Sequence, residues 1–197
     1  MTATDTSTAD QPDQEIERVP GEGDMWFFVL FESLVFTSYF CVYLYFRTQD
    51  EAAFLEAQAA LTLPLGIVDT ILLLTSSWAI ARCAHHARAA QHRVAQQFAV
   101  ATAGLGVAFL ALKLVEWVAL ISDGHTFTSG DFMQHFFFLT GMHAIHLLIG
   151  FVVLGVLLQQ LADPARRSPT TIETCTTYWH TVDLFWVLIF ALLYIVR

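Results

Sequence analysis

The sequence predicts an all-α integral membrane protein, a polytopic bundle of five transmembrane helices, and three observations predict it. Of the 197 residues, 56% are hydrophobic and 14% are charged, and the mean hydropathy is +0.56. This composition lies far outside that of ordinary soluble domains. Five segments each supply the roughly 20 mostly apolar residues that a membrane-spanning helix needs. Short polar stretches separate these segments, as expected for the loops between spans.

The chain begins with an acidic segment, residues 1–24, which contains little apolar surface. Its acidic side chains are Asp5, Asp10, Asp13, Glu15, Glu17, Glu22 and Asp24, and its only basic one is Arg18. Such a segment cannot offset its chain entropy by burial, so it is predicted to be a disordered tail that precedes a membrane domain over residues 25–197. It is not a signal peptide, because it is acidic and no apolar run begins before Met25. The first apolar run is therefore expected to be retained as a span.

The five predicted spans follow one another along the rest of the chain. They are Met25–Phe46, Leu63–Ala84, Phe98–Ile121, Phe132–Leu161 and Thr174–Val196. Pro64 and Pro164 suit helix boundaries, where a missing backbone N–H costs little. The fourth span is longer than a bilayer requires, so it should tilt or project beyond the lipid. The polar stretch "RTQDEAAFLEAQAALT" is interpreted as the first connecting loop.

The arginines are distributed unevenly between the two sides of such a bundle. With five spans, one side carries Arg18, Arg82, Arg88, Arg93, Arg166 and Arg167, whereas the other carries Arg47 and Arg197. The positive-inside rule then predicts a cytoplasmic N-terminus and a C-terminus outside the cell.

Two classes of function are disfavoured by the remaining composition. Cys41, Cys83 and Cys175 are widely separated, so packing is a better interpretation for them than a disulfide framework or a zinc site. The basic residues are few and scattered among loops, which excludes a nucleic-acid-binding role.

Ionisable residues within the spans are the candidates for function, because each is costly in lipid unless it is paired or faces the protein interior. They are Glu32, Asp69, Lys113, Glu116, His143, His146, His180 and Asp183. Lys113 and Glu116 are three residues apart, which allows a local ion pair with either a structural or a functional role. His180 and Asp183 have the same spacing, and the same two interpretations stay open. Asp69 lies near the start of its span and is expected to reach the membrane interface.

Glu32 differs from the others because no basic residue lies within a turn of it along its own helix. A lone carboxyl in an apolar span tends to be protonated or to pair with another helix. Glu32 is therefore the best candidate for a proton-linked or reactive carboxyl, and a hydrogen-bonded interior glutamic acid is the alternative.

His143 and His146, in "TGMHAIH", could form a metal site, a proton relay or a polar stripe used in packing. The sequence contains neither the Glu-x-x-His signature of helix-bundle metal cages nor HExxH. We therefore expect no metal and no catalytic residue in this chain. The pair is instead expected to face other helices, where imidazoles can hydrogen-bond with Glu116, Glu32 or His180. A membrane cytochrome or metal-binding redox enzyme is kept as the alternative of another class.

Several stretches together resemble the last five helices of subunit III of haem-copper terminal oxidases. In order, they are "WFFVLFESLVFTSYFCVYLYFR", "LTSSWAIARCAHHA", "LKLVEWVALISDG", "FFFLTGMHAIHLLIG" and "YWHTVDLFWVLIFALLYIVR". The resemblance covers Gly23 to Arg197, and "TGMHAIH" and "YWHTVD" are its most specific parts.

The resemblance implies a non-catalytic accessory subunit in the plasma membrane of a bacterium. Its partners would be the catalytic subunit I and subunit II, which hold the haem and copper, together with structural phospholipids. It would support assembly, stability and proton uptake in aerobic electron transport. By the same resemblance, Glu32 matches the family's carbodiimide-reactive carboxyl. Further family positions fall on Glu116, His143, His146, Tyr178, Trp179, His180 and Asp183.

One departure concerns length, because the first two helices of the long family form are absent. Shorter five-helix forms include the subunit III-like protein that accompanies nitric oxide reductase. "LYFRTQDEAAFLEAQAAL" and "LLLTSSWAIA" resemble that branch more closely than the mitochondrial type. An accessory role in nitric oxide reductase is therefore the second interpretation.

Overall fold

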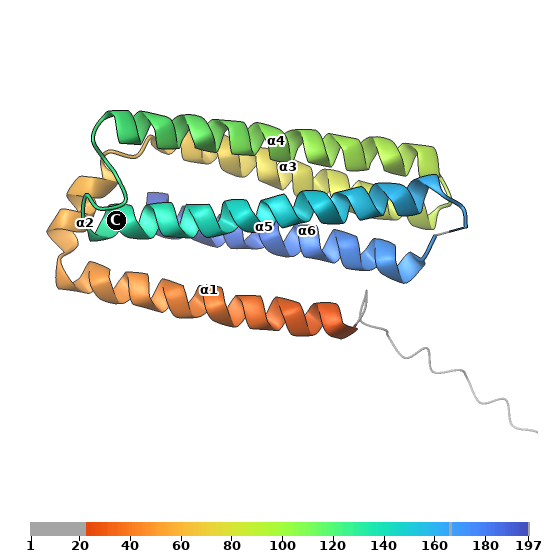
Figure 1. The fold of residues 1–197 in the computed structure, drawn as a ribbon, viewed down its shortest axis with the longest axis horizontal. Helices are drawn as coiled ribbons and strands as arrows, with labels where there is room; N and C mark the ends of the chain where they lie inside the picture. The colour runs from red at the N-terminus through yellow and green to blue at the C-terminus, as the bar shows by residue number, and fades with distance from the viewer. Residues whose placement is uncertain (1–22, 166, 197) are drawn as a thin grey trace, which may run out of the picture.

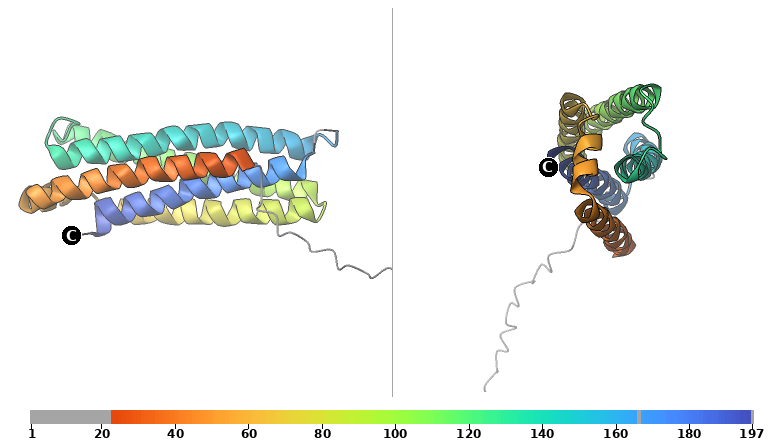
Figure 2. Two further views of the ribbon diagram at one scale, coloured as in Figure 1. Left: turned by 90° about the horizontal axis from the view of Figure 1, so that it is seen from below. Right: turned by 90° about the vertical axis from the view of Figure 1, so that its left-hand side faces the viewer.

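The computed structural model describes residues 23–165 and 167–196, and it is built from long, nearly parallel or antiparallel helices (Figures 1 and 2). The elements are α1 (Gly23–Gln49), α2 (Glu51–Gln58), α3 (Leu63–Arg88), α4 (His92–Ser122), α5 (Asp131–Ala162), α6 (Pro169–Phe190) and the π-helix η1 (Ala191–Ile195). In the part of the chain described, no β-strand occurs. All five predicted spans are found as helices that are long and apolar enough to cross a membrane. The predicted fold class is thereby confirmed.

The predicted acidic tail falls almost entirely outside the described residues. Only its last two positions, Gly23 and Asp24, are described, and they form the first turn of α1. Asp24 suits that position, since a carboxylate near a helix N-terminus interacts favourably with the helix dipole.

Several helices extend further than their apolar cores, because polar residues at the ends continue the backbone hydrogen bonding. α4 begins at His92, well before the predicted start at Phe98. α5 contains 32 residues, which corresponds to a length of about 48 Å and exceeds the roughly 30 Å of a hydrocarbon core. The helix must therefore tilt, or its ends must project into the interface, as the length of the apolar segment predicts.

The stretch interpreted as the first loop contains the short helix α2. Asp50 caps it by accepting a hydrogen bond from the Ala53 backbone N–H at 3.1 Å. Phe54 is only 3% exposed, and the Gln58 Nε2 donates to the carbonyl oxygens of Leu193 and Val196 at 2.9 and 3.1 Å. α2 is therefore held by tertiary contacts, which a polar composition does not reveal.

The two ends of the bundle gather different segments, as Figure 1 shows. The start of α1, the α3–α4 turn and the α5–α6 connection lie at one end. α2, the α4–α5 connection and the last described residues lie at the other. Arg82, Arg88, Arg93 and Arg167 belong to segments of the first end, and Arg47 belongs to the second.

Trp179 of α6 fills the centre of the bundle, where two glycines allow it to approach α4 and α5. A Cβ atom at Gly106 or Gly150 would come within 3.1 or 3.0 Å of the indole ring. Gly104, Gly141 and Gly155 have no such neighbour. Of these five glycines, Gly106 and Gly150 are therefore the two that permit close packing within the described chain.

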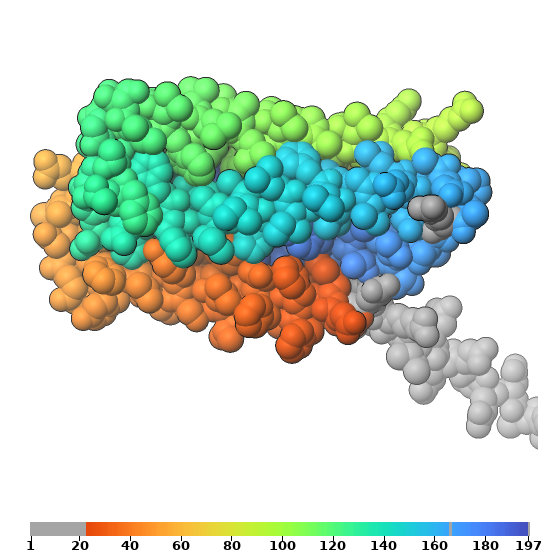
Figure 3. All heavy atoms as spheres, in the orientation of Figure 1, coloured from red at the N-terminus to blue at the C-terminus, as the bar shows by residue number. Residues whose placement is uncertain are grey.

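α1 packs less tightly than the other spans and lies along α5 and α6 at one edge of the molecule (Figures 1 and 3). Its buried residues are Met25, Phe36, Tyr43 and Arg47. The remaining large apolar side chains of α1 are mostly exposed, as a helix surrounded by lipid or by a partner requires.

Candidate functional site

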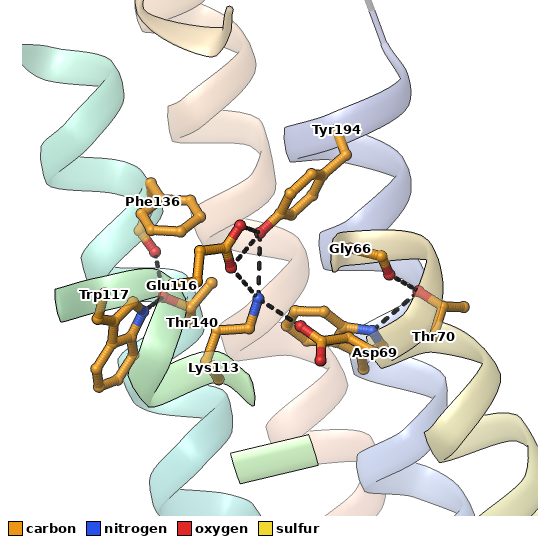
Figure 4. Close-up of polar contacts among 10 residues, drawn as sticks. Gly66, Asp69, Thr70, Lys113, Glu116, Trp117, Phe136, Thr140 and Tyr194 are labelled. Carbon is orange, nitrogen blue, oxygen red and sulfur yellow. Dashed lines mark hydrogen bonds and ion pairs between the residues drawn. The ribbon is translucent and has the colours of Figure 1, made fainter. Parts of the chain in front are cut away.

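The most extensive buried polar cluster joins α3, α4 and η1 around Lys113, and Figure 4 shows it. The Lys113 Nζ lies 2.9 Å from Asp69 Oδ2, 2.5 Å from Glu116 Oε2 and 3.1 Å from the Tyr194 hydroxyl oxygen. The exposed fractions of these four residues are between 0% and 2%. Lys113 donates hydrogen bonds to Glu116 and to Tyr194, whereas Asp69 Oδ2 is in ion-pair contact without an aligned hydrogen bond.

Aromatic rings surround the ammonium group. Its Nζ lies 4.5 Å from the centroid of the Trp186 ring, which is within the range of a cation–π interaction. The Trp186 Nε1 in turn donates to Thr70 Oγ1 at 3.1 Å, and Thr70 donates to the Gly66 carbonyl at 2.8 Å (Figure 4). The cluster is thus fixed by hydrogen bonds from α6 to α3 as well as by its own charges.

Tyr194 reaches the cluster because of two local features. The chain changes from α-helix to π-helix at Ala191, and the wider turn rotates the side chains that follow. Gly66 then leaves room for the ring, since a Cβ there would lie 2.9 Å from Tyr194 Cδ1. The Tyr194 hydroxyl donates to Glu116 at 2.8 Å.

Neither Asp69 nor Tyr194 is predicted from the sequence to belong to this cluster. Asp69, expected at the membrane interface, is fully buried beside Lys113, so that expectation is wrong. Tyr194 is a cluster member that the sequence does not single out, since no local pattern distinguishes it from the other tyrosines. The sequence does contain a signal for the burial of Asp69. Lys113 is the single lysine in the spans, and a buried lysine needs acidic partners.

Glu32 pairs with a histidine from another helix. The His146 Nε2 lies 3.1 Å from Glu32 Oε2, and the His146 Nδ1 lies 2.8 Å from the carbonyl oxygen of Met142. A carbonyl can only accept, so Nδ1 carries a hydrogen. The contact between Nε2 and Oε2 then requires one proton between the two groups, whichever of them holds it. The side chain of Glu32 is 15% exposed, so the pair lies at the edge of the bundle.

His143 lies one turn from His146 but has a different environment. Its ring contacts those of Phe109 and Trp186, with centroids 5.5 and 5.2 Å away. Both of its ring nitrogens are buried and have no hydrogen-bond partner among the described residues. Of the three acceptors suggested for the histidine pair, only Glu32 is in contact, and its contact is with His146.

His180 and Asp183 do not pair with each other, although their spacing allows it. The His180 Nδ1 lies 2.7 Å from Ser77 Oγ on α3. Asp183 is 3% exposed and lies near the same serine, but neither of its oxygens has a well-aligned hydrogen bond to a described residue. Ser77 therefore replaces the carboxylate as the group that orients the imidazole.

No cluster suited to metal binding occurs within residues 23–165 and 167–196, where no three His, Cys, Asp or Glu side chains are grouped to hold an ion. Cys41, Cys83 and Cys175 do not form disulfides with one another. The fold and these contacts define a polytopic integral membrane protein with a buried polar interior.

Comparison with known proteins identifies the family within that class. Residues 21–197 match the family model of cytochrome c oxidase subunit III. The chain is 28% identical over 172 residues to cytochrome c oxidase subunit 3 of a Bacillus species, which covers 86% of this chain and 83% of that protein. It is 30% identical over 171 residues to the Synechocystis protein of the same name, covering 85% and 72%. It is 26% identical over 180 residues to haem-copper oxidase subunit I+III of Aeropyrum pernix, covering 87% and 22%.

The chain belongs to the cytochrome c oxidase subunit III family. It is an accessory subunit of a haem-copper terminal oxidase, and as such it associates with the catalytic subunits. The resemblance noted in the sequence is thereby confirmed. The nitric oxide reductase alternative is not favoured, because all three of these relatives are named as oxidase subunits.

Proposed function

We propose that Glu32 and His146 form a proton-sharing pair through which this subunit supports proton uptake and stability of the catalytic subunit I. The observation that carries the proposal is the contact between His146 Nε2 and Glu32 Oε2, which needs one proton between the two groups. Because Glu32 lies on the exposed helix α1 and His146 on α5, the pair also links α1 to the rest of the bundle. A proton that moves between the two groups converts a neutral hydrogen-bonded pair into an ion pair, with no change in net charge and without breaking the link.

Substitution of Glu32 tests this role. We expect Glu32→Gln and Glu32→Ala to leave assembly of the oxidase largely intact, to remove reactivity of this position toward carbodiimide and to shorten the active lifetime of the enzyme during turnover. The measurements are yield of the purified complex, carbodiimide labelling and the decay of oxygen consumption. Glu56→Gln is the matched control, since Glu56 is an exposed carboxyl on α2.

Two outcomes separate this role from a structural one. If Glu32→Ala abolishes assembly and changes nothing else, Glu32 is a structural residue. If both variants assemble and decay at the rate of the Glu56→Gln control, the pair has no role in turnover.

The redox cofactors of the complex are proposed to lie in the partner subunits, with haem and copper in subunits I and II and none in this chain. A visible spectrum and a metal analysis of the isolated chain test this, and we expect neither a Soret band nor stoichiometric metal. Haem or metal at one per chain would instead favour a membrane cytochrome.

The groove between α1 and α5 is proposed to hold an acyl chain of a structural phospholipid. It has a volume of about 370 Å³ and is lined almost entirely by apolar side chains. They include Leu34, Val35, Val42, Phe138 and Met142, with Tyr39 beside them. An open apolar groove inside a bilayer is filled by lipid unless a protein covers it.

The orientation proposed is a cytoplasmic N-terminus and an outside C-terminus in a bacterial plasma membrane. It is supported by the arginines that gather at the α3–α4 turn and the α5–α6 connection. Reporter sites placed after α2 and in the α3–α4 turn should be modified from opposite sides. Modification of both from one side would contradict this topology.

A further inference from the structure

The charges around Lys113 do not balance if every group is ionised. Asp69 and Glu116 are both within ion-pair distance of Lys113, and it is the only described cation in such contact with either carboxyl. The other helices bring no further positive charge to the described cluster. η1 contributes the Tyr194 hydroxyl, α6 contributes the ring of Trp186, and α5 contributes His143, whose imidazole contacts the Trp186 ring.

A net negative charge in this position is unfavourable. All three ionisable residues are at most 2% exposed, and the helices that hold them span the membrane. An uncompensated buried charge is so costly that a carboxyl in this setting binds a proton instead. The cluster is therefore expected to contain one proton more than full ionisation would leave.

The directions of the hydrogen bonds indicate which carboxyl holds the extra proton. Tyr194 accepts from Lys113, so its single O–H is available for Glu116, which it reaches at 2.8 and 2.9 Å. Glu116 receives this donor and one from Lys113, which suits a carboxylate. Asp69 has only the ion-pair contact of Oδ2 with Lys113, and neither of its two buried oxygens has an aligned hydrogen bond to a described residue.

We propose that Asp69 is a protonated carboxylic acid in the membrane, which makes the Asp69–Lys113–Glu116 cluster a proton-binding site without net charge. The site is distinct from the Glu32–His146 pair and does not depend on the role proposed for that pair. The site binds a single proton. Lys113 and Glu116 neutralise each other's charge, and the proton neutralises Asp69. Loss of that proton would place an unpaired charge in the seam between α3, α4 and η1.

Infrared spectroscopy of membranes that contain the full chain with its partner subunits tests the proposal. The carbonyl stretch of a protonated carboxylic acid is separate from that of a carboxylate. We expect the spectrum of wild type minus Asp69→Asn to contain one carboxylic acid band per chain, which shifts when aspartate is labelled with ¹³C. In the matched variant Glu116→Gln, Asp69 becomes the sole carboxyl beside Lys113 and should ionise, so this variant should also lose the carboxylic acid band, and the ¹³C aspartate label is what assigns the band. Contributions from Glu32, from Asp183 and from the partner subunits are common to wild type and Asp69→Asn and cancel in the difference.

A second measurement keeps the proposal testable if Asp69→Asn does not assemble. In Asp183→Asn with ¹³C-labelled aspartate confined to this subunit, Asp69 is the only labelled aspartate left in the apolar part of the described spans. A labelled carboxylic acid band must then remain, and its absence would overturn the proposal. A wild-type carboxylic acid band of the cluster that shifts with ¹³C-labelled glutamate and not with ¹³C-labelled aspartate would also overturn it, because the proton would then belong to Glu116.

Discussion

Lys113 connects three separate elements, since its ion-pair and hydrogen-bond partners lie on α3, α4 and η1. A buried ion pair contributes little net stability compared with apolar packing, because desolvation offsets the attraction. Removal of one partner is different, since the remaining charges then have no compensation. The cluster is therefore sensitive to single substitutions at Lys113.

The substitution Lys113→Met should destabilise the folded chain by about 3–5 kcal/mol, because it leaves the buried Glu116 carboxylate without a cation. The change is measured as a fall in the melting temperature of the purified complex and in its yield. Arg88→Met is the control. This substitution also removes an ion pair, the one with Glu173, but the Arg88 side chain is 63% exposed. An exposed pair contributes about 0–1 kcal/mol. Equal effects of the two substitutions would contradict the importance of burial.

At the scale of helices, packing around Trp179 determines how closely α4, α5 and α6 approach one another. Its indole Nε1 donates to Ser76 Oγ on α3 at 2.9 Å, so the residue also fixes α6 against α3. The ring fits because Gly106 and Gly150 present only backbone to it. Small residues permit such contacts between helices in lipid, where no hydrophobic effect drives association.

Gly150→Val should therefore displace Trp179 and destabilise the bundle by about 1–3 kcal/mol, the usual cost of overpacking. Gly141→Val on the same helix is the control, because a Cβ at Gly141 meets no atom within 4 Å. Thermal unfolding monitored by tryptophan fluorescence compares them. If Gly141→Val lowers the transition as much as Gly150→Val, the loss arises from helix propensity and not from contact with Trp179.

At the scale of the whole molecule, α1 is attached to a compact four-helix unit by a few specific contacts. They include the Glu32–His146 pair, a stacked pair of Phe36 and Phe185 rings with centroids 4.3 Å apart, and the Arg47 hydrogen bond to the Val196 carbonyl at 2.6 Å. Because so much of α1 is exposed, its position in the membrane depends on what fills the groove beside α5.

A larger side chain in this groove should displace the lipid proposed to occupy it. We expect Val35→Trp to lower the number of phospholipids that remain with the purified protein, as counted by native mass spectrometry. Leu30→Trp is the control, since Leu30 is also on α1 and 68% exposed but does not line the groove. An unchanged lipid count in Val35→Trp would argue that the groove is empty or is covered by protein.

The short helix α2 marks the limit of what hydropathy reveals. Its residues are polar enough to be assigned to a loop, although Asp50 followed by "EAAFLEAQ" is also a capped run of good helix formers. What makes α2 a fixed element is the burial of Phe54 and the hydrogen bonds from Gln58 to the end of the chain. Neither can be inferred from the local sequence.

The five spans, their order, the family and most of the ionisable residues within the spans can be predicted from the sequence alone, although the buried Arg47 and His135 are missed. These follow from local properties, because lipid requires about 20 apolar residues with internally satisfied backbone and makes each embedded charge conspicuous. Which of those residues meet is known from the packed structure and not from the local sequence. His143 and His146 are one turn apart yet face different surroundings, and Asp69 and Tyr194 come from distant parts of the chain to meet at Lys113. Such partners depend on the rotation of each helix about its axis and on the glycines and π-turn that let helices approach, and these are properties of the packed bundle.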